Sequence, residues 1–153
     1  MQALIAQFNR LYAALEKPFE MKDFVLLFLR AWVAKIFYQS GRTKVDADES
    51  FFAPTDLTVM LFEDEYGLPI LSPELAAQLA VYAETFLPIM LLLGLGARIG
   101  AAGLIAMTLV IQFLVYPGFF PDHATWLAGL LPVLMIGPGR ISVDHLIAKR
   151  TAM

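Results

Sequence analysis

Cysteine is absent from the sequence, and charged residues are few. The lack of cysteine excludes disulfides, thiolate metal sites and haem attached through a Cys-x-x-Cys-His motif. Only 16% of the 153 residues are charged, whereas a soluble domain carries about 25%. The formal net charge of -3 offers no basis for binding nucleic acid, which depends on dense lysine and arginine contacts to phosphate. A nucleic-acid partner is therefore not expected.

Apolar residues are what the sequence has in excess. They make up 59% of the chain, and the mean hydropathy is +0.67. Four apolar stretches, at about residues 24–40, 75–95, 99–117 and 124–137, are separated by polar segments. A helix that spans a membrane needs roughly 17 to 25 such residues, which the fourth stretch reaches only with its flanks. We expect residues 1–153 to form a single all-α domain, an integral membrane four-helix bundle.

Two further segments carry amphipathic patterns. Near the amino terminus, apolar residues recur at helical spacing, namely Leu4, Ile5, Phe8, Leu11, Tyr12 and Leu15. This pattern predicts an amphipathic helix that lies in the membrane interface or packs on protein. The loop over residues 41–74 contains eight acidic residues, and its "DLTVMLFEDEYG" stretch predicts a short amphipathic element folded against the bundle. That loop is either a functional cap or a structural lid over the helix ends.

The cations outside the apolar stretches predict the orientation. With the amino terminus inside, the inner segments carry seven of them: Arg10, Lys17, Lys22, Arg98, Arg140, Lys149 and Arg150. The outer segments carry Arg42 and Lys44. The positive-inside tendency then places both termini in the cytoplasm and the acidic loop outside. His123 and His145 fall on opposite sides of the membrane in this topology, so a shared metal or haem is not expected.

Three ionised side chains fall within the apolar stretches, and each is costly in hydrocarbon. They are Arg30, Lys35 and Glu84. Insertion costs of about 2.5 to 3.5 kcal/mol for Arg or Lys predict that they face the bundle interior rather than lipid. We expect Glu84 to pair with Lys35, or with Arg30 through its longer side chain. One cation is then left over.

The remaining cation suggests a polar pocket in the bundle for an anionic or quinone-like ligand. Its candidate ligand-binding residues are Arg30, Lys35, Tyr38, Glu84 and Gln112, with Tyr82 as an alternative to Tyr38. The other interpretation is a structural salt bridge beside an Arg30 that extends to the inner interface. No catalytic residue and no metal site is predicted.

Several motifs of the sequence resemble those of the DoxX family. The run "RAWVAKIFYQSGRTKV" has an early arginine and a Ser-Gly-x-x-Lys ending, and it is followed in order by Glu84, by "GLGARIGA" and by "GPGRISVD". The resemblance covers about residues 24–148, and Lys35 departs from it. The family-motif residues are Ser40, Gly41, Lys44, Arg98, Gly137, Pro138, Gly139, Arg140 and Asp144.

The resemblance implies a multi-pass protein of the bacterial inner membrane with a partner-dependent role. DoxX proteins are associated with quinone-linked sulfur oxidation, as the small subunit of a thiosulfate:quinone oxidoreductase, and with mycobacterial complexes that resist oxidative stress. The acidic loop resembles the branch found beside genes for metal-buffering peptides. These associations imply a membrane component of a redox or stress and metal-handling system, at most a subunit of a quinone-linked oxidoreductase. No cofactor is expected within the chain itself, and quinone is the cofactor class implied.

A non-catalytic role is the second hypothesis. In it the chain is a membrane anchor or assembly factor, and its acidic loop recruits a periplasmic partner. Whether the chain forms a homo-oligomer stays open.

The carboxy-terminal motif has a local interpretation in both hypotheses. Gly137, Pro138 and Gly139 end the fourth helix, Ser142 caps a short helix with Asp144 at its positive end, and Arg140 lies at the inner surface near lipid phosphate or Arg98.

Overall fold

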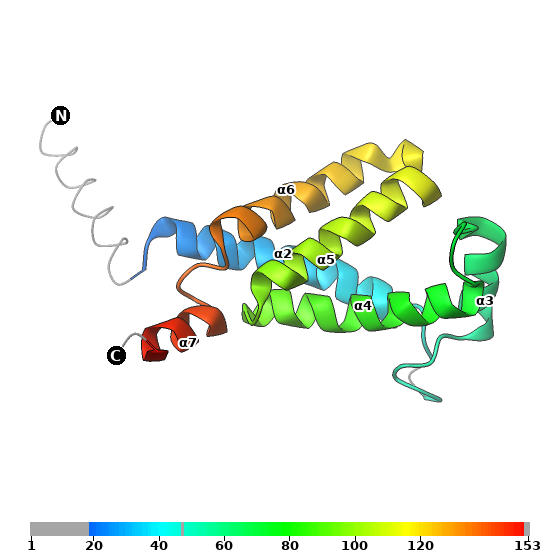
Figure 1. Cartoon of the computed structure of the whole chain (residues 1–153), viewed down its shortest axis with the longest axis horizontal. Helices are drawn as coiled ribbons and strands as arrows, with labels where there is room; N and C mark the ends of the chain where they lie inside the picture. The colour runs from blue at the N-terminus through cyan, green and yellow to red at the C-terminus, as the bar shows by residue number, and fades with distance from the viewer. Residues whose placement is uncertain (1–18, 47, 152–153) are drawn as a thin grey trace, which may run out of the picture.

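The computed structural model describes residues 19–46 and 48–151, and in these ranges it is helical without a strand. The predicted all-α fold class is confirmed. The amphipathic helix expected over residues 4–15 lies outside the described residues. The long helices run side by side along the longest axis of the molecule (Figure 1).

Four long helices correspond to the four apolar stretches. They are α2 (Met21–Arg42), α4 (Pro73–Leu93), α5 (Ala97–Val110) and α6 (Phe120–Ile136). A π-helical turn, η2 (Ile111–Val115), extends α5, and the short 3-10 turn η3 (Pro117–Phe119) leads into α6. Three segments of the described chain are long and apolar enough to cross a membrane, at Pro73–Leu93, Ala97–Val115 and Pro117–Ile136. The helix α2, with its several charges, is not among them.

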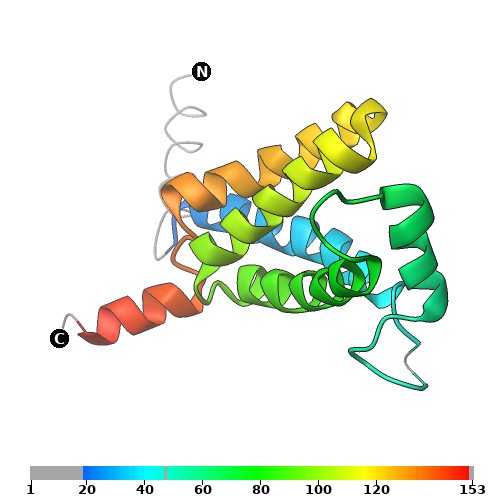
Figure 2. The same ribbon diagram turned by 45° about the vertical axis from the view of Figure 1, so that its right-hand side comes forward.

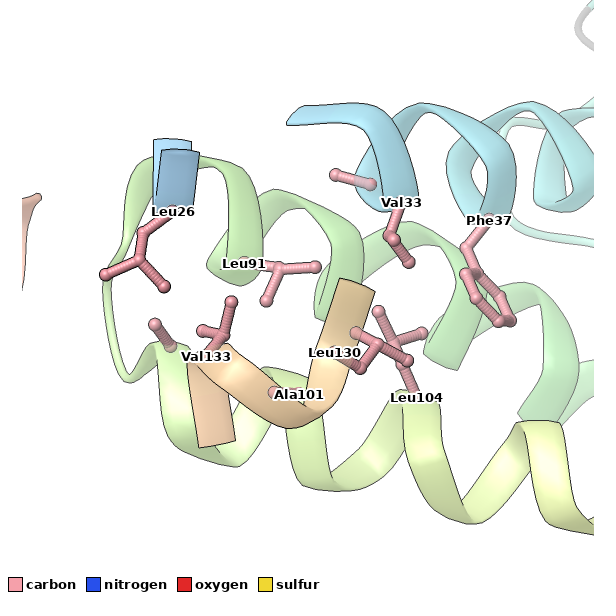
Figure 3. Close-up of a cluster of buried hydrophobic side chains, with 10 residues drawn as sticks. Leu26, Val33, Phe37, Leu91, Ala101, Leu104, Leu130 and Val133 are labelled. Atoms are coloured by element: carbon pink, nitrogen blue, oxygen red, sulfur yellow. The ribbon is translucent and has the colours of Figure 1, made fainter. Parts of the chain in front are cut away.

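The four helices close into a bundle. Each packs on the next, and α6 packs back on α2. Apolar side chains from all four meet in one core, as the close-up shows for Leu26, Val33, Phe37, Leu91, Ala101, Leu104, Leu130 and Val133 (Figure 3). A glycine sets one close approach, because a Cβ on Gly129 of α6 would lie 2.5 Å from Val33.

A lid covers one end of the bundle. We use this name for residues 55–71, which contain α3 (Asp56–Leu61) and the π-helical turn η1 (Phe62–Tyr66). Thr55 caps α3, since its hydroxyl accepts a hydrogen bond from the Thr58 backbone N–H at 3.2 Å. Phe62 is buried against Ala76 and Ala77 of α4. The amphipathic element expected from "DLTVMLFEDEYG" is this lid, and it lies at the end of the bundle opposite α7 (Val143–Thr151) (Figures 1 and 2).

Arg30 joins three segments at the α7 end. Its guanidinium is fully buried and donates hydrogen bonds to the carbonyls of Leu91 at 3.2 Å, Leu92 at 3.0 Å and Ile141. The last carbonyls of a helix lack partners within it, and the negative end of the helix dipole favours a cation there. Arg30 therefore caps the carboxyl end of α4 rather than extending to the interface.

The carboxy-terminal motif completes this end. Asp144 lies in the first turn of α7, as expected, and also accepts hydrogen bonds from the backbone N–H groups of Gly96 at 2.8 Å and Ala97 at 3.0 Å, so it caps α5 as well. Ser142 does cap α7, by accepting from the His145 N–H at 3.2 Å. The Asp144 hydrogen bonds hold the chain after α6 against the turn between α4 and α5.

Two arginines of this end bind protein groups. The Arg140 side chain forms an ion pair with Glu20 at 2.5 Å, and its backbone N–H donates to the buried Asp23 at 2.8 Å. Arg98 is exposed and reaches the last carbonyls of α6, including that of Ile136 at 3.3 Å. The two arginines therefore bind protein groups at separate places.

Candidate functional site

The interior of the bundle near the lid contains one ion pair, and its partners are not those predicted. Glu84 of α4 accepts from the Lys44 ammonium at 2.8 Å, and only 4% of Glu84 and 8% of Lys44 is exposed. The same ammonium also donates to the hydroxyl of Ser40 at 3.0 Å and to its carbonyl at 3.3 Å. All three donors of Lys44 thus have acceptors, which is what a buried charge requires.

Gly41 explains how the two helices come close enough for this pair. A Cβ at Gly41 would lie 2.8 Å from the Cβ of Glu84, nearer than real side chains approach. The three residues of the Ser40-Gly41-x-x-Lys44 motif therefore act together. Gly41 allows α4 to approach closely, Ser40 accepts hydrogen bonds from the Lys44 ammonium, and Lys44 neutralises Glu84.

The expected pairing of Glu84 with Lys35 or Arg30 is wrong. Arg30 lies opposite Leu91 and Gly41 lies opposite Glu84, so Glu84 is level with the end of α2 and not with its middle. Lys35 is exposed and lines a shallow groove between α2 and α4. The prediction that Lys35 faces the bundle interior is wrong as well.

A cavity of about 320 Å³ adjoins the ion pair. It lies between the lid, the lid-proximal half of α4, the η2 end of α5 and the start of α6. Most of its wall is apolar. The side chains with polar or aromatic groups that line it are Ser40, Lys44, Phe62, Tyr66, Glu84, Tyr116, His123 and Trp126.

His123 presents a hydrogen-bond acceptor to this cavity. The Gln112 amide donates through Nε2 to the Pro117 carbonyl at 2.8 Å, which leaves its Oε1 to accept from Nδ1 of His123 at 2.6 Å. In the neutral imidazole, Nε2 is then the unprotonated nitrogen. It has no hydrogen-bond partner among the described residues, and the His123 side chain lines the cavity. Gln112 orients this ring from the π-helical turn, and does not itself line the cavity.

Two tyrosines fasten the lid over the cavity. The Tyr116 hydroxyl, between η2 and η3, donates to the Glu65 carboxylate of the lid, and the Tyr66 ring meets the Tyr116 ring at 5.8 Å. The hydrogen bond to Glu65 raises the pKa of Tyr116, and burial raises the pKa of Tyr66. Both phenols stay neutral at physiological pH, and that of Tyr116 is the donor to Glu65.

Comparison with known proteins places this geometry in a family. The family model of DoxX matches residues 25–117, which is more than half of the chain. The chain belongs to the DoxX family. The match includes the Ser40-Gly41-x-x-Lys44 motif and Glu84, and it ends before the Gly137–Asp144 segment. Searches for similar curated proteins and for similar solved structures gave no match.

The protein is therefore a DoxX membrane protein whose apolar helices contact the lipid bilayer. Two tyrosines that the sequence suggested for the pocket, Tyr38 and Tyr82, lie outside the cavity. Tyr38 lines the Lys35 groove, with the Arg42 guanidinium 5.5 Å from its ring. Tyr82 is exposed and stands beside Phe52, with the ring centroids 6.0 Å apart.

The DoxX cavity also contains residues that sequence reasoning missed. The sequence identifies Lys44 only as a motif residue and His123 only as a rejected metal ligand, and Trp126 is not among the candidate residues. The sequence signal for Lys44 is its spacing after Gly41 at a helix end. No local signal places His123, because its neighbour Gln112 comes from a different helix.

The DoxX cavity can hold a ligand that is mainly apolar and carries polar atoms at two places. Lys44 offers a charged donor and Glu84 a carboxylate acceptor on one side. His123 offers an imidazole acceptor from α6, beside the Trp126 ring, whose centroid lies 4.9 Å away. Among the described residues, no group of three or more His, Cys, Asp or Glu side chains could hold a metal ion.

Proposed function

We propose that this DoxX protein is a partner-dependent component of a redox system in the bacterial inner membrane and binds a quinone in its cavity. The observation that carries the proposal is the pairing of an apolar cavity with polar groups from two sides, the Lys44–Glu84 ion pair and the open Nε2 of His123. Ligand sites in proteins are mostly apolar with few well-placed polar groups. A quinone has an apolar ring with two oxygens, which matches this distribution.

The polar groups also match the two redox forms of such a ligand. The Lys44 ammonium can donate to a quinone carbonyl in place of its long 3.3 Å hydrogen bond to the Ser40 carbonyl. His123 and Glu84 can accept from the hydroxyls of the quinol. Reduction takes up two electrons and two protons, and oxidation releases them. The residues described hold the ring and its protons, while the electron donor or acceptor is a partner protein.

The proposed topology has α2 as a fourth span, both termini in the cytoplasm and the lid in the periplasm. It is supported by the charges at the two ends. Arg98, Arg140, Lys149 and Arg150 lie at the α7 end, where the positive-inside tendency favours the cytoplasm. The lid end carries the exposed acids.

Tryptophan fluorescence tests the quinone proposal, because the chain has two tryptophans and only Trp126 lines the cavity. We expect decyl-ubiquinone to quench the fluorescence of a Trp32→Phe variant saturably in lipid nanodiscs. Replacing His123 by leucine in that background should weaken binding about tenfold, the cost of one lost hydrogen bond in an apolar site.

His145→Leu is the matched control, since His145 is exposed at the other end of the molecule. It should leave the quenching curve unchanged. The proposal would fail if Trp126 were quenched linearly without saturation, or if His123→Leu and His145→Leu gave the same affinity.

The exposed acids favour a second function, the recruitment of a periplasmic partner. The eight acids from Asp46 to Glu74 are all exposed, including Glu63 and Asp64 on the lid. Reversing the charge at these two lid positions, Glu63→Lys with Asp64→Lys, should abolish recovery of a partner in pull-downs from native membranes. Lys149→Glu with Arg150→Glu is the control at the α7 end. Unchanged recovery after the lid reversal would contradict recruitment by the lid, and quinone quenching should persist in either variant.

A further inference from the structure

We propose that the groove around Lys35 docks a transmembrane helix of a different protein, and that this helix carries a carboxylate near mid-membrane. The inference rests on α2 crossing the bilayer beside α4, and is otherwise independent of the quinone proposal. It assigns a role to the one ionised side chain that the sequence placed in the bundle and the structure places outside it.

Lys35 is an exposed cation within α2, about two thirds of the way from Lys22 to Arg42. It has no hydrogen bond or ion pair among residues 19–46 and 48–151. At about 1.5 Å per residue it lies roughly 20 Å from Lys22 and about 10 Å from Arg42 along the helix. A charged lysine at such a depth costs several kcal/mol when it faces hydrocarbon.

The direction of the side chain limits its escape to water. In a helix the Cα–Cβ bonds tilt toward the amino end, so Lys35 is directed away from the nearer end of α2 and toward the farther one. A lysine chain is too short to cover about 20 Å. Lipid headgroups are therefore poorly reached from this position, and a counter-charge at the same depth is the better solution.

The groove has the shape of a helix-packing site. Its volume is about 230 Å³, and it is lined by Ala31, Ala34 and Tyr38 of α2 and by Pro88, Ile89 and Leu92 of α4. Ala34 is buried in the core, but Ala31 is partly exposed, and a small residue at that position lets a neighbouring helix approach closely in the membrane. Ile89 and Leu92, which are 40% and 45% exposed, supply apolar contact around the charge.

Charge complementarity selects the occupant. A second copy would have to offer a free carboxylate at the depth of Lys35. In the described helices the acid nearest to mid-span is Glu84, and its charge is already neutralised by Lys44 inside the bundle. The other acids of the four long helices α2, α4, α5 and α6 are Asp23, Glu74 and Asp122, and all three lie within the first turns of their helices. The fitting occupant is therefore a different helix with its own Asp or Glu.

Synthetic transmembrane peptides test this inference directly. The probe is a labelled leucine-alanine helix of about 20 residues with one central Asp, and the comparison peptide has Leu there. Energy transfer to the full-length protein in phosphatidylcholine vesicles at pH 8 should show about tenfold tighter association of the Asp peptide. Lys35→Met should remove the preference, and Lys35→Glu should transfer it to a host peptide with a central Lys.

Lys22→Met is the control, because Lys22 is exposed at the end of α2 and pairs with Glu20. It should keep the preference for Asp. Equal association of the Asp and Leu peptides with the wild type would overturn the inference. So would self-association of the wild type that Lys35→Met abolishes and the Asp peptide does not displace, which would assign the groove to a second copy. Enrichment of anionic lipid at Lys35 with no peptide preference would assign it to a headgroup.

Discussion

Replacing Arg30 by methionine is expected to lower the free energy of unfolding by roughly 3 to 5 kcal/mol, since a hydrogen bond to a charged group contributes about 1.5 to 3 kcal/mol. The substitution keeps an apolar side chain of similar length but removes the donors for Leu92 and Ile141. The Leu91 carbonyl still accepts from the Gly94 N–H at 3.2 Å, so it loses less. Denaturation in mixed micelles, followed by circular dichroism, measures the change.

Arg98→Met is the matched control for this loss. Arg98 also binds carbonyls at a helix end, but it is exposed and its contacts to Met135 and Ile136 are long, at 3.5 and 3.3 Å. Its removal should cost less than about 1 kcal/mol, as for other exposed polar contacts. Arg30→Lys should recover little, because Arg30 binds Leu92 and Ile141 through two different nitrogens of its planar guanidinium, and the compact ammonium of lysine lacks this fork. Equal losses for Arg30→Met and Arg98→Met would contradict the capping role of Arg30.

Breaking the buried pair on one side should have a comparable effect. Glu84→Gln leaves the Lys44 ammonium buried without a counter-charge, and Lys44→Met leaves the Glu84 carboxylate buried without one. Removing one partner of a buried ion pair typically costs about 3 to 5 kcal/mol, whereas removing both can be nearly neutral. The variant with Lys44→Met and Glu84→Met together should therefore be closer to wild type in stability than either single variant.

The double variant also separates structure from function. If the pair binds the quinone, the restored protein should still fail to give saturable quenching of Trp126. Recovery of both stability and quenching would make the pair purely structural. A double variant as unstable as the single ones would instead contradict the assigned coupling between Lys44 and Glu84.

The helices of this protein follow closely from its apolar pattern. The stretches at residues 24–40 and 75–95 become α2 (Met21–Arg42) and α4 (Pro73–Leu93). The differences arise where polar residues begin a helix through backbone caps. Glu20 and Asp23 cap α2 reciprocally, and Ser72 caps α4, so both helices begin before their apolar residues do. Hydropathy alone does not register these caps.

The contacts of the charged residues could not be predicted in the same way. Counting depth from the start of each apolar stretch treats α2 and α4 as level, and this assumption places Lys35 opposite Glu84. The actual offset is set by Gly41, where α4 approaches the backbone of α2, and by Arg30, which needs the end of α4. Such an offset depends on tertiary packing. The motif Ser40-Gly41-x-x-Lys44 contains the partner of Glu84, but the sequence does not say that Gly41 faces α4, and without that contact the pairing cannot be predicted.

Lys44 connects the cavity to the lid, because its side chain binds in one and its backbone in the other. Its ammonium binds Glu84 at the cavity, while its carbonyl accepts from the Thr55 N–H at 3.1 Å and the Thr58 hydroxyl at 2.9 Å in the lid. A cavity ligand that draws the ammonium away from Glu84 would shift Lys44, whose carbonyl binds the lid. Thermodynamic reciprocity then requires that a protein seated on the lid change the affinity for that ligand by the same factor. Occupancy within the membrane would thus be communicated to the aqueous surface through a single residue.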